Sequence, residues 1–201
     1  MPGLLLDTLR GTRGDRCPIW LMRQAGRYLP EYRALRAEKG GFLALVYDSE
    51  AAAEITLQPI RRFGFDGAIL FSDILIVPYA MGQDLEFLAG EGPHLSPTLI
   101  DTTLDSLHAV PERLTPIYET VARVKAGLGR ERTLLGFAGS PWTVATYMVA
   151  GQGSRDQHES RALAYRDPQA FQAIIDAIVA VTCDYLAGQI AAGAEAVQLF
   201  D

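Results

Sequence analysis

The sequence predicts an α/β fold in which short strands and helices alternate along 201 residues. Several short apolar runs show little alternation with polar residues, as expected where helices cover both faces of a parallel sheet. Helical stretches separate these runs, and such βα repeats join parallel strands by right-handed crossovers. The expected strands are 18–22, 67–71, 133–138 and 196–200. A doubly wound sheet and a (β/α)8 barrel both fit this pattern.

Two observations favour the (β/α)8 TIM barrel. No strand is followed by a glycine-rich phosphate loop of the GxGxxG or GxxxxGK[ST] type. The polar residues Arg23, Asp73 and Asp201 come just past predicted strands, as in barrels whose sites combine several strand ends. A whole barrel needs about 250 residues, so we expect roughly the first four βα units, as a truncated or natural half-barrel. We expect one incomplete domain over 1–201, with an open apolar edge at its last strand.

Capping residues and helix breakers predict the other elements. Asp48 or Ser49 would cap one helix, which Pro59 would kink, and Gly193 would end another. Ser140–Pro141 is typical of a helix start. The helices expected are 49–62, 111–126, one from 141, and 168–192, with a β-hairpin inserted over 84–103.

The composition indicates an acidic globular protein with a net charge of −6 and a pI of about 5.1. Only two of its eighteen basic residues are lysine, so nucleic acid is not an expected partner. The apolar runs are too short to predict a membrane span, and the N-terminus lacks the basic region of a secretory signal. Cys17 and Cys183 match no zinc or redox spacing, so we expect small core residues in a reduced, cytoplasmic protein.

The most informative stretch is 23–27, Arg-Gln-Ala-Gly-Arg, which directly follows the apolar run 18–22. Guanidinium forks hold carboxylates and phosphates bidentately, and Gly26 lets the backbone turn sharply or approach a ligand. From Arg10 to Arg36 there are seven arginines and two acids, a local charge of +5 on a chain whose remainder carries −11. The stretch therefore predicts a site for an anion with several carboxylates or phosphates. An ordinary surface loop with salt bridges is the alternative.

Two further polar residues stand in apolar sequence. Asp73 precedes the apolar stretch 74–77, and a carboxylate in such surroundings needs partners or its pKa rises. It could bind ligand N–H groups or stabilise a developing cation, but a helix cap or an ion pair fits equally well. Tyr147 lies four residues past Thr143 on one helix face. Its hydroxyl could line a pocket, or Tyr147 and Trp142 could both be core aromatics.

The absence of other motifs limits the chemistry. The histidines at 94, 108 and 158 are isolated and match no metal spacing. No GxSxG elbow is present, and no carboxylate pair has a spacing typical of glycosidases. The candidate chemistry therefore needs no metal or cofactor and uses arginine, aspartate and tyrosine.

Two longer strings resemble signatures of the uroporphyrinogen decarboxylase family. Residues 18–32, PIWLMRQAGRYLPEY, are similar to its N-terminal signature, and residues 136–143, GFAGSPWT, to its second one. Residues 71–75 and 196–201 match as well. The resemblance covers essentially the whole chain, which corresponds to the N-terminal part, somewhat over half, of a family member.

The resemblance implies a (β/α)8 barrel, a homodimer and no cofactor. The implied enzyme is a carboxy-lyase that removes CO2 from the four acetate side chains of uroporphyrinogen, giving coproporphyrinogen. This polycarboxylate tetrapyrrole suits an arginine-rich cleft, and its converging pyrrole N–H groups suit one buried carboxylate.

By similarity, Asp73 would stabilise a cationic pyrrole and Arg23 would be a candidate proton donor. The family's hydroxyl residue directly after Asp201, and its C-terminal histidine, lie beyond this chain. We therefore expect the chain alone to be inactive and poorly soluble or oligomeric. The implied substrate-binding residues are Arg23, Gln24, Ala25, Gly26, Arg27, Arg36, Asp73 and Tyr147.

Two other functions stay open. A related barrel could transfer methyl groups to or from a corrinoid, although the chain lacks the metal-ligand cluster expected for thiol activation. A half-barrel could also bind a tetrapyrrole without catalysis, or serve as an assembly piece.

Overall fold

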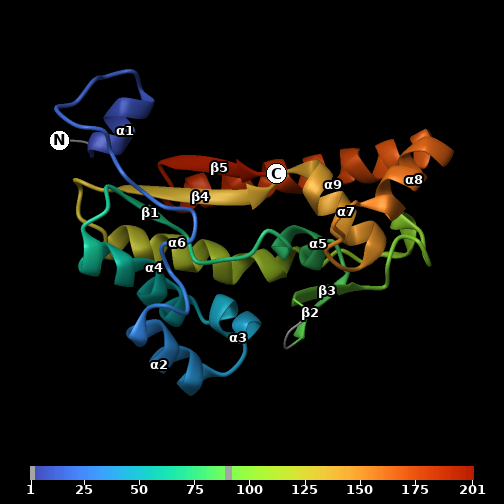
Figure 1. Cartoon of the computed structure of the whole chain (residues 1–201), viewed down its shortest axis with the longest axis horizontal. Coiled ribbons are helices and arrows are strands. Elements are labelled where there is room, and N and C mark those ends of the chain that lie inside the picture. The colour runs from blue at the N-terminus through green and yellow to red at the C-terminus, as the bar shows by residue number, and fades with distance from the viewer. Residues whose placement is uncertain (1–2, 89–91) are drawn as a thin grey trace. The chain divides into compact units, whose positions relative to one another are not determined.

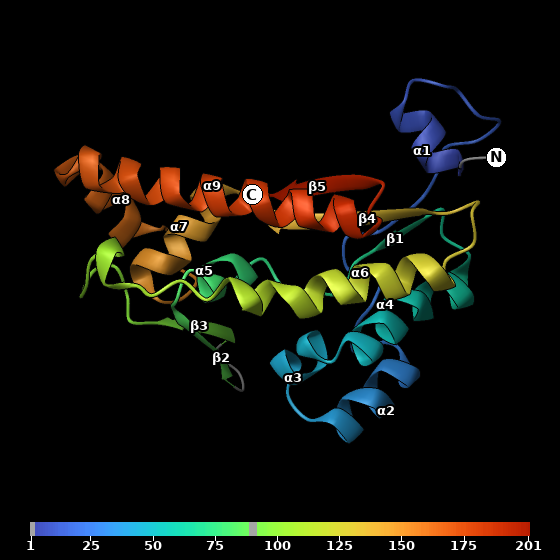
Figure 2. The same cartoon turned by 180° about the vertical axis from the view of Figure 1, so that it is seen from behind.

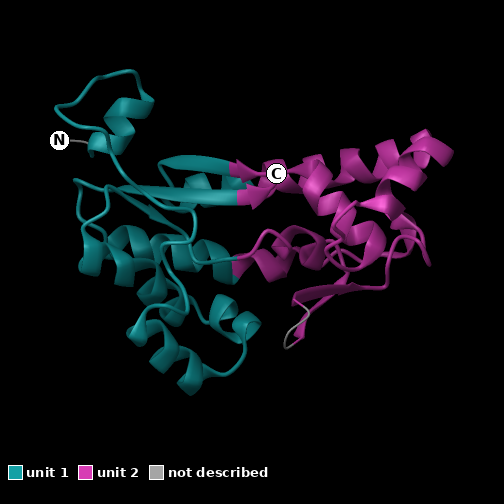
Figure 3. Ribbon diagram, viewed as in Figure 1, with its two compact units in different colours: residues 1–72, 116–137, 186–198 teal, residues 73–115, 138–185, 199–201 magenta. Residues whose placement is uncertain are grey.

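A computed structural model describes residues 3–88 and 92–201, shown from opposite sides in Figures 1 and 2. The chain forms two compact units (Figure 3). Unit 1 comprises residues 1–72, 116–137 and 186–198, and unit 2 comprises residues 73–115, 138–185 and 199–201. The expectation of a single domain over 1–201 stays a prediction.

A three-stranded sheet has the order β1 (Gly67–Ile69), β4 (Thr133–Gly139), β5 (Ala196–Phe200). Each strand falls on a predicted apolar run. β1 and β4 pair in parallel, with Gly67 opposite Thr133. The central strand β4 is buried along its whole length, which explains why its sequence shows no polar alternation.

β4 and β5 are also parallel. The Glu195 N–H donates to the Leu134 carbonyl near the start of the pair, and the Ser140 N–H donates to the Phe200 carbonyl at its end. Residue numbers therefore rise together along both strands, and Figure 1 draws them as arrows pointing the same way. The carboxyl ends of these strands meet at one edge of the sheet.

The predicted strand over 18–22 is wrong. Side chains, not a neighbouring strand, accept two of its backbone N–H groups: Ile19 donates to the Asp66 carboxylate at 2.8 Å, and Leu21 donates to Gln24 Oε1 at 3.1 Å. A ladder would need these groups for a neighbouring backbone, so the segment stays irregular. It is also not buried. Its exposed apolar side chains are Ile19, Leu21 and Met22.

In unit 1, helix α4 (Ser49–Phe63) packs against β1. α4 begins where predicted because the Asp48 side chain accepts the Ala51 N–H at 3.0 Å, and it ends at Gly64, whose φ is 68°. The helix continues through Pro59 to Phe63. The sequence patterns do not predict α1, α2 or α3. The helical segments of unit 1 are α1 (Leu4–Leu9), α2 (Pro30–Lys39), α3 (Phe42–Tyr47), α4 (Ser49–Phe63), most of α6 (Thr115–Gly127) and the last part of α9 (Pro168–Ala192).

A hydrophobic cluster joins α2, α3 and α4 in unit 1. Ala25 from the loop 23–27 packs against this cluster. Phe71, after β1, packs there too, with its ring 5.9 Å from that of Tyr32. The cluster thus fixes the base of the arginine loop. Its buried members are Leu29, Tyr32, Leu45, Ala51 and Ile55.

Unit 2 contains an antiparallel hairpin, β2 (Asp84–Leu88) and β3 (Gly92–Ser96), within the range 84–103 where one is predicted. Residues 89–91 of that range lie outside the described residues. The bounds of α9 match the predicted helix 168–192, whereas α8 is not predicted. The helices are α5 (Ile76–Ala80), α7 (Pro141–Ala150), α8 (His158–Arg166), the first part of α9 (Pro168–Ala192), and 3-10 turns at Leu104–Ser106 and Pro111–Leu114.

Helix α9 corrects the expectation that every apolar segment is too short to cross a membrane. It has 25 residues and is apolar enough by composition, although core helices of soluble proteins pass the same test. The expectation failed because scattered polar residues divide the helix into short apolar runs without making it polar on average.

The two cysteines correct a second expectation. Cys17 and Cys183 are free and exposed, so neither is a core residue. Cysteine is often buried in proteins, but Cys17 lies in the irregular segment before Pro18 and Cys183 on an exposed part of α9.

Candidate active site

One buried side chain fixes the loop 23–27 to the sheet. Gln24 is 1% exposed, and its Nε2 donates to the carbonyl of Gly67, the first residue of β1, at 3.0 Å. Its Oε1 accepts the Leu21 N–H at 3.1 Å. The oxygen and the nitrogen of this amide therefore both form hydrogen bonds with backbone groups of the chain. Gln24 thus anchors the arginine loop.

The arginines at the two ends of this loop are exposed. Across residues 3–88 and 92–201, the guanidinium groups of Arg23 and Arg27 form neither a hydrogen bond nor an ion pair. Other arginines of unit 1 are paired, such as Arg16 with Asp66. The alternative of a loop with ordinary salt bridges therefore does not describe Arg23 and Arg27. Their fork-shaped donors remain available to an anion.

Packing within the chain does not require a glycine at position 26. Among the described residues, a Cβ on Gly26 would meet only the Tyr28 ring, at 3.8 Å, and the φ of Gly26 lies outside the left-handed region. At Gly67, by contrast, a Cβ would lie 2.6 Å from the Leu5 side chain. A side chain at position 26 would therefore meet only ordinary contact with the Tyr28 ring among the described residues.

Arg36 lies in the last turn of α2 and is half-buried. One of its N–H groups donates to the Tyr32 hydroxyl at 3.3 Å. Since a guanidinium has five N–H donors, this bond leaves most of them for other partners. Arg36 shares unit 1 with the loop 23–27.

Asp73 lies in unit 2, beside the end of β4. Its Oδ1 accepts the Leu75 N–H at 2.8 Å, a hydrogen bond within a local turn. The next residue, Ile74, packs against Gly139: a Cβ on that glycine would lie 3.0 Å from the Ile74 Cβ. Asp73 is therefore held near the carboxyl end of a parallel strand, where α/β proteins bind ligands.

Asp201 follows β5 at the same edge of the sheet. Its Oδ1 accepts a hydrogen bond from the Thr143 hydroxyl at 3.0 Å, across 58 residues of sequence. Sequence analysis does not select Thr143 as a site residue. The sequence feature that could have indicated this contact is that Thr143 and Asp201 both come just after strands that are neighbours in the sheet.

Tyr147 lies one turn after Thr143 on α7 and is half-buried. No described residue forms a hydrogen bond with its hydroxyl. Trp142, by contrast, donates its indole N–H to Gln157 Oε1 at 2.8 Å and packs on Phe171 with ring centroids 5.5 Å apart. Trp142 therefore has the packing role left open for both aromatics, whereas Tyr147 keeps a hydroxyl available.

The predicted site residues divide between the two units. Residues 23–27 and Arg36 belong to unit 1, whereas Asp73 and Tyr147 belong to unit 2. Within unit 2, Asp73 and Asp201 both lie at carboxyl ends of strands. Nowhere in the described ranges do three or more His, Cys, Asp or Glu side chains gather as a metal site.

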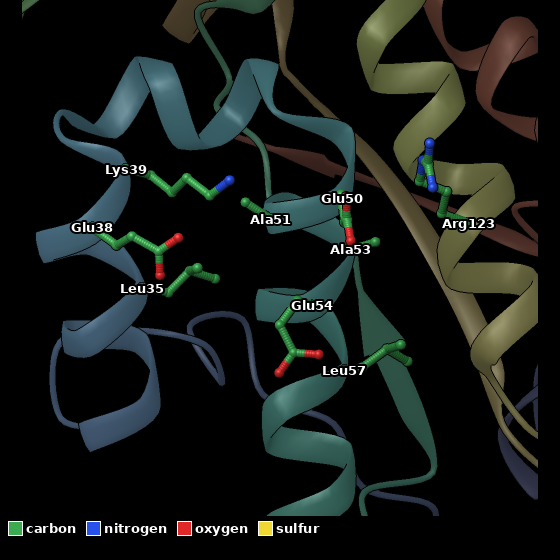
Figure 4. Close-up of a pocket in the computed structure, with 9 residues that line it drawn as sticks. All are labelled: Leu35, Glu38, Lys39, Glu50, Ala51, Ala53, Glu54, Leu57 and Arg123. Carbon is green, nitrogen blue, oxygen red and sulfur yellow. The ribbon is translucent and has the colours of Figure 1, made fainter.

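A cavity of about 440 Å³ lies among α2, α4 and α6 of unit 1 (Figure 4). Its charged lining consists of Glu38, Glu50, Glu54, Lys39 and Arg123. The surplus of carboxylates disfavours a polyanionic ligand. Among the described residues, those that line this cavity include no predicted site residue. The cavity is therefore not the candidate site.

Asp66 is a structural carboxylate directly before β1 that sequence analysis missed. It accepts hydrogen bonds from both terminal nitrogens of Arg16, at 2.7 and 2.6 Å, and from the Ile19 N–H at 2.8 Å. The hydrogen bond from Arg16 is the largest cause that lowers the pKa of Asp66, and burial opposes it. The signal in the sequence was one acid placed just before a strand on an arginine-rich chain.

The parallel strands, with helices between them, define an α/β protein, a class in which ligands bind at the carboxyl edge of the sheet. The family model described as Uroporphyrinogen decarboxylase (URO-D) matches residues 2–201. The chain therefore belongs to the uroporphyrinogen decarboxylase family, as the strings at 18–32 and 136–143 predict.

Curated relatives agree with this assignment. A uroporphyrinogen decarboxylase of Novosphingobium aromaticivorans is 80% identical over 201 residues, which cover 100% of this chain and 59% of the relative. That of Erythrobacter litoralis is 76% identical with the same coverage of 100% and 59%. That of Paracoccus denitrificans is 56% identical over 200 residues, 98% of this chain and 58% of the relative. The chain thus spans less than two thirds of the length of these relatives.

A solved structure shares the fold. A methyltransferase from Methanosarcina mazei superposes with a TM-score of 0.73 at 16% identity, over 96% of this chain and 56% of that chain. At so low an identity the likeness concerns the fold and not the reaction.

Proposed function

We propose that the whole protein decarboxylates the four acetate side chains of uroporphyrinogen and gives coproporphyrinogen in tetrapyrrole synthesis, without a cofactor. Membership of the family supports this reaction. The structural observation that carries the proposal is the pair of exposed guanidiniums at Arg23 and Arg27, which have no partner within the described residues.

The arginine loop suits the charge of the substrate. Uroporphyrinogen carries eight carboxylates, and each can accept two parallel N–H bonds from a guanidinium. Arg23, Arg27 and Arg36 would bind these carboxylates, and the lack of a side chain at Gly26 would let the backbone approach the substrate. Gln24 and Ala25 would hold the loop in place through the amide bonds and the hydrophobic cluster described above.

Asp73 would face the pyrrole N–H groups. One carboxylate oxygen stabilises the local turn through the Leu75 N–H. The negative charge of this carboxylate would stabilise a ring that becomes cationic during the reaction, which is electrostatic preorganisation. Tyr147 would add a hydrogen bond to the substrate through its hydroxyl.

The proposed chemistry balances without an external oxidant. A proton adds to a pyrrole ring carbon, with Arg23 as the candidate donor, and the ring becomes cationic. The electron pair of the bond to the carboxylate then moves toward the ring, and CO2 leaves. A second proton adds to the former acetate carbon, which becomes a methyl group, and the ring carbon loses its extra proton. Asp73 lowers the energy of the cationic state throughout.

We also propose the fold and setting of the whole protein. A (β/α)8 barrel of which this chain holds roughly the first four units would continue the parallel sheet beyond β5, as the length of the relatives and the shared fold suggest. We propose a cytoplasmic homodimer with no nucleic-acid or membrane partner. The reading as a corrinoid methyltransferase has no support beyond the fold, because the solved methyltransferase is only 16% identical.

The test is CO2 release from uroporphyrinogen by the purified whole protein, with coproporphyrinogen identified as the product by mass. Turnover without added metal, flavin or pyridoxal phosphate, and after treatment with a chelator, is expected. Absence of turnover on uroporphyrinogen, or turnover only after a cofactor is added, would overturn the proposal. The 201-residue chain assayed in parallel is expected to be inactive.

A further inference from the structure

The loop after α7 lies directly on the hydroxyl of Tyr147. A Cβ built on Gly153 would come 3.1 Å from Tyr147 Oη, 3.4 Å from Cζ and 3.5 Å from Cε1. The first of these distances is shorter than an ordinary carbon–oxygen contact. Glycine at position 153 is therefore what lets the backbone approach the phenol so closely.

The start of this loop is fixed to α7 and to the hairpin. The Gly151 N–H donates to the Tyr147 carbonyl at 2.7 Å, in a left-handed conformation with a φ of 78°. The Gly151 carbonyl in turn accepts the Leu95 N–H of β3 at 2.7 Å. Gln152 forms an antiparallel bridge with His94 on the same strand. The residue before Gly153 is thus tied to a strand, which limits how far the loop can move away.

The end of the loop returns to the first turn of α7. Gln157 has a left-handed backbone, with a φ of 53°, that is uncommon for a residue other than glycine. Its side-chain Oε1 accepts the Trp142 indole N–H at 2.8 Å, and its backbone N–H donates to the Ser154 hydroxyl at 3.1 Å. The Trp142 ring packs on Phe171 of α9. The loop 151–157 therefore forms a strap from the last turn of α7 back to its first.

We propose that Gly153 and the Gln157–Trp142 hydrogen bond are positioning elements that set the place of the Tyr147 hydroxyl for the substrate. This inference rests on the proposed function of Tyr147 in binding uroporphyrinogen. The strap restricts the phenol from one side. The Tyr147 hydroxyl has no hydrogen-bond partner in the described part of the chain, so its donor and acceptor remain for the ligand.

A larger residue at 153 would push the phenol by a few tenths of an ångström. Displacements near 1 Å in a positioned group cost about a hundredfold in rate, so a shift of this smaller size should cost roughly tenfold in kcat/KM. This loss in kcat/KM should arise because the Tyr147 hydroxyl is displaced. In a protein that lacks the hydroxyl, the same change at position 153 should cost much less.

The test is a double-mutant cycle in the whole protein, with Gly153→Ala, Tyr147→Phe and the combination. We expect Gly153→Ala to lower kcat/KM roughly tenfold in the presence of Tyr147 and less than about twofold in the Phe background. Gly41→Ala is the matched control, because a Cβ there meets none of the described residues within 4 Å and the φ of Gly41 is −71°. Equal losses in both backgrounds would overturn the proposal.

Two substitutions of Gln157 test the hydrogen bond that fixes the end of the strap to Trp142. Gln157→Leu removes the acceptor of the Trp142 N–H, whereas Gln157→Glu keeps an oxygen in its place. We expect Leu to reproduce the loss of Gly153→Ala and Glu to restore most of the activity. A Leu variant as active as the parent would remove Gln157 from the proposal.

A readout without substrate separates this inference from the proposed function. In protein labelled with 13C-tyrosine, Tyr147→Phe assigns the Tyr147 ring signal. Gly153→Ala should shift that signal and Gly41→Ala should not. If Gly153→Ala shifts the Tyr147 signal but the parent protein fails to release CO2 from uroporphyrinogen, the proposed function is wrong and the positioning role of the strap is supported. If the Tyr147 signal does not shift, the strap does not position Tyr147, even if the protein is an active decarboxylase.

Discussion

The side-chain amide of Gln24 spans the gap between the Leu21 N–H and the Gly67 carbonyl, and the Gln24 side chain is 1% exposed. This amide adds a side-chain link between the segment 18–22 and β1, beside the backbone bond in which the Asp66 N–H donates to the Ile19 carbonyl at 2.9 Å. It therefore links the arginine loop to the sheet while leaving the guanidiniums outside.

Replacing Gln24 by Leu should destabilise the protein, because the buried amide bonds are lost and two backbone groups remain unpaired. We expect a loss of about 1–3 kcal/mol in the free energy of unfolding for each unsatisfied group, measured by urea denaturation of the whole protein. Gln169→Leu on the exposed first turn of α9 is the control. A Gln24→Leu protein as stable as the control would contradict the anchoring role.

The ion pair between Arg16 and Asp66 should make stability depend on pH. The pKa of Asp66 is lowered in the folded state, mainly by the hydrogen bond from Arg16. The unfolded state therefore binds more protons in acid, and the stabilisation present above about pH 4 is lost as the pH falls through the lowered pKa. Asp66→Asn should flatten the loss of stability below about pH 4.

Urea titrations at a series of pH values measure this effect, with the exposed Asp176→Asn on α9 as the matched control. The control should keep the steep acid limb of the parent. An Asp66→Asn protein with an unchanged acid limb would mean that Asp66 titrates alike in the folded and unfolded states.

Asp73→Asn separates charge from structure in the proposed reaction. An asparagine keeps the oxygen that accepts the Leu75 N–H, so the local turn should survive. If the negative charge stabilises a cationic pyrrole in the transition state, kcat should fall about 10²–10³-fold with a smaller change in KM. Steady-state rates with uroporphyrinogen check this, and a rate within about twofold of the parent would leave Asp73 a structural carboxylate.

Arg27→Ala should weaken substrate binding with little effect on stability. Arg27 is exposed, and its guanidinium has no hydrogen bond or ion pair among residues 3–88 and 92–201, so folding loses no partner. A polyanion bound through fewer cations should show a higher KM and a weaker dependence of KM on salt. The exposed Arg130→Ala, outside the predicted site, is the control and should keep the parent salt dependence.

Arg23→Lys tests whether the fork shape matters. A lysine keeps the positive charge but loses the planar, bidentate geometry. If Arg23 holds a carboxylate with two parallel bonds, kcat/KM should fall while the free energy of unfolding stays the same. Unchanged kinetics would show that Arg23 acts only as a point charge.

Local patterns in the sequence determined much of the fold. The strand 196–200 and the helix 168–192 agree with the structure residue for residue, because largely apolar segments and cap residues act over short distances. The start of α4 followed from Asp48, whose side chain caps a helix that begins at the next residue. The positions of Arg23, Asp73 and Asp201 after apolar runs also indicated where a ligand site would be.

The tertiary structure decided which groups bond across long distances. The segment 18–22 has the sequence pattern of a strand, yet the side chains of Gln24 and Asp66 accept two of its backbone N–H groups. Hydrophobic periodicity does not reveal that side chains replace a neighbouring strand as hydrogen-bond acceptors. The bond from Thr143 to Asp201 joins residues 58 apart. Only the folded chain shows that Gly153 lies against the Tyr147 hydroxyl, because this contact depends on how the loop 151–157 is fixed at both ends. Sequence thus specified the residue types and the local elements, and packing specified their partners.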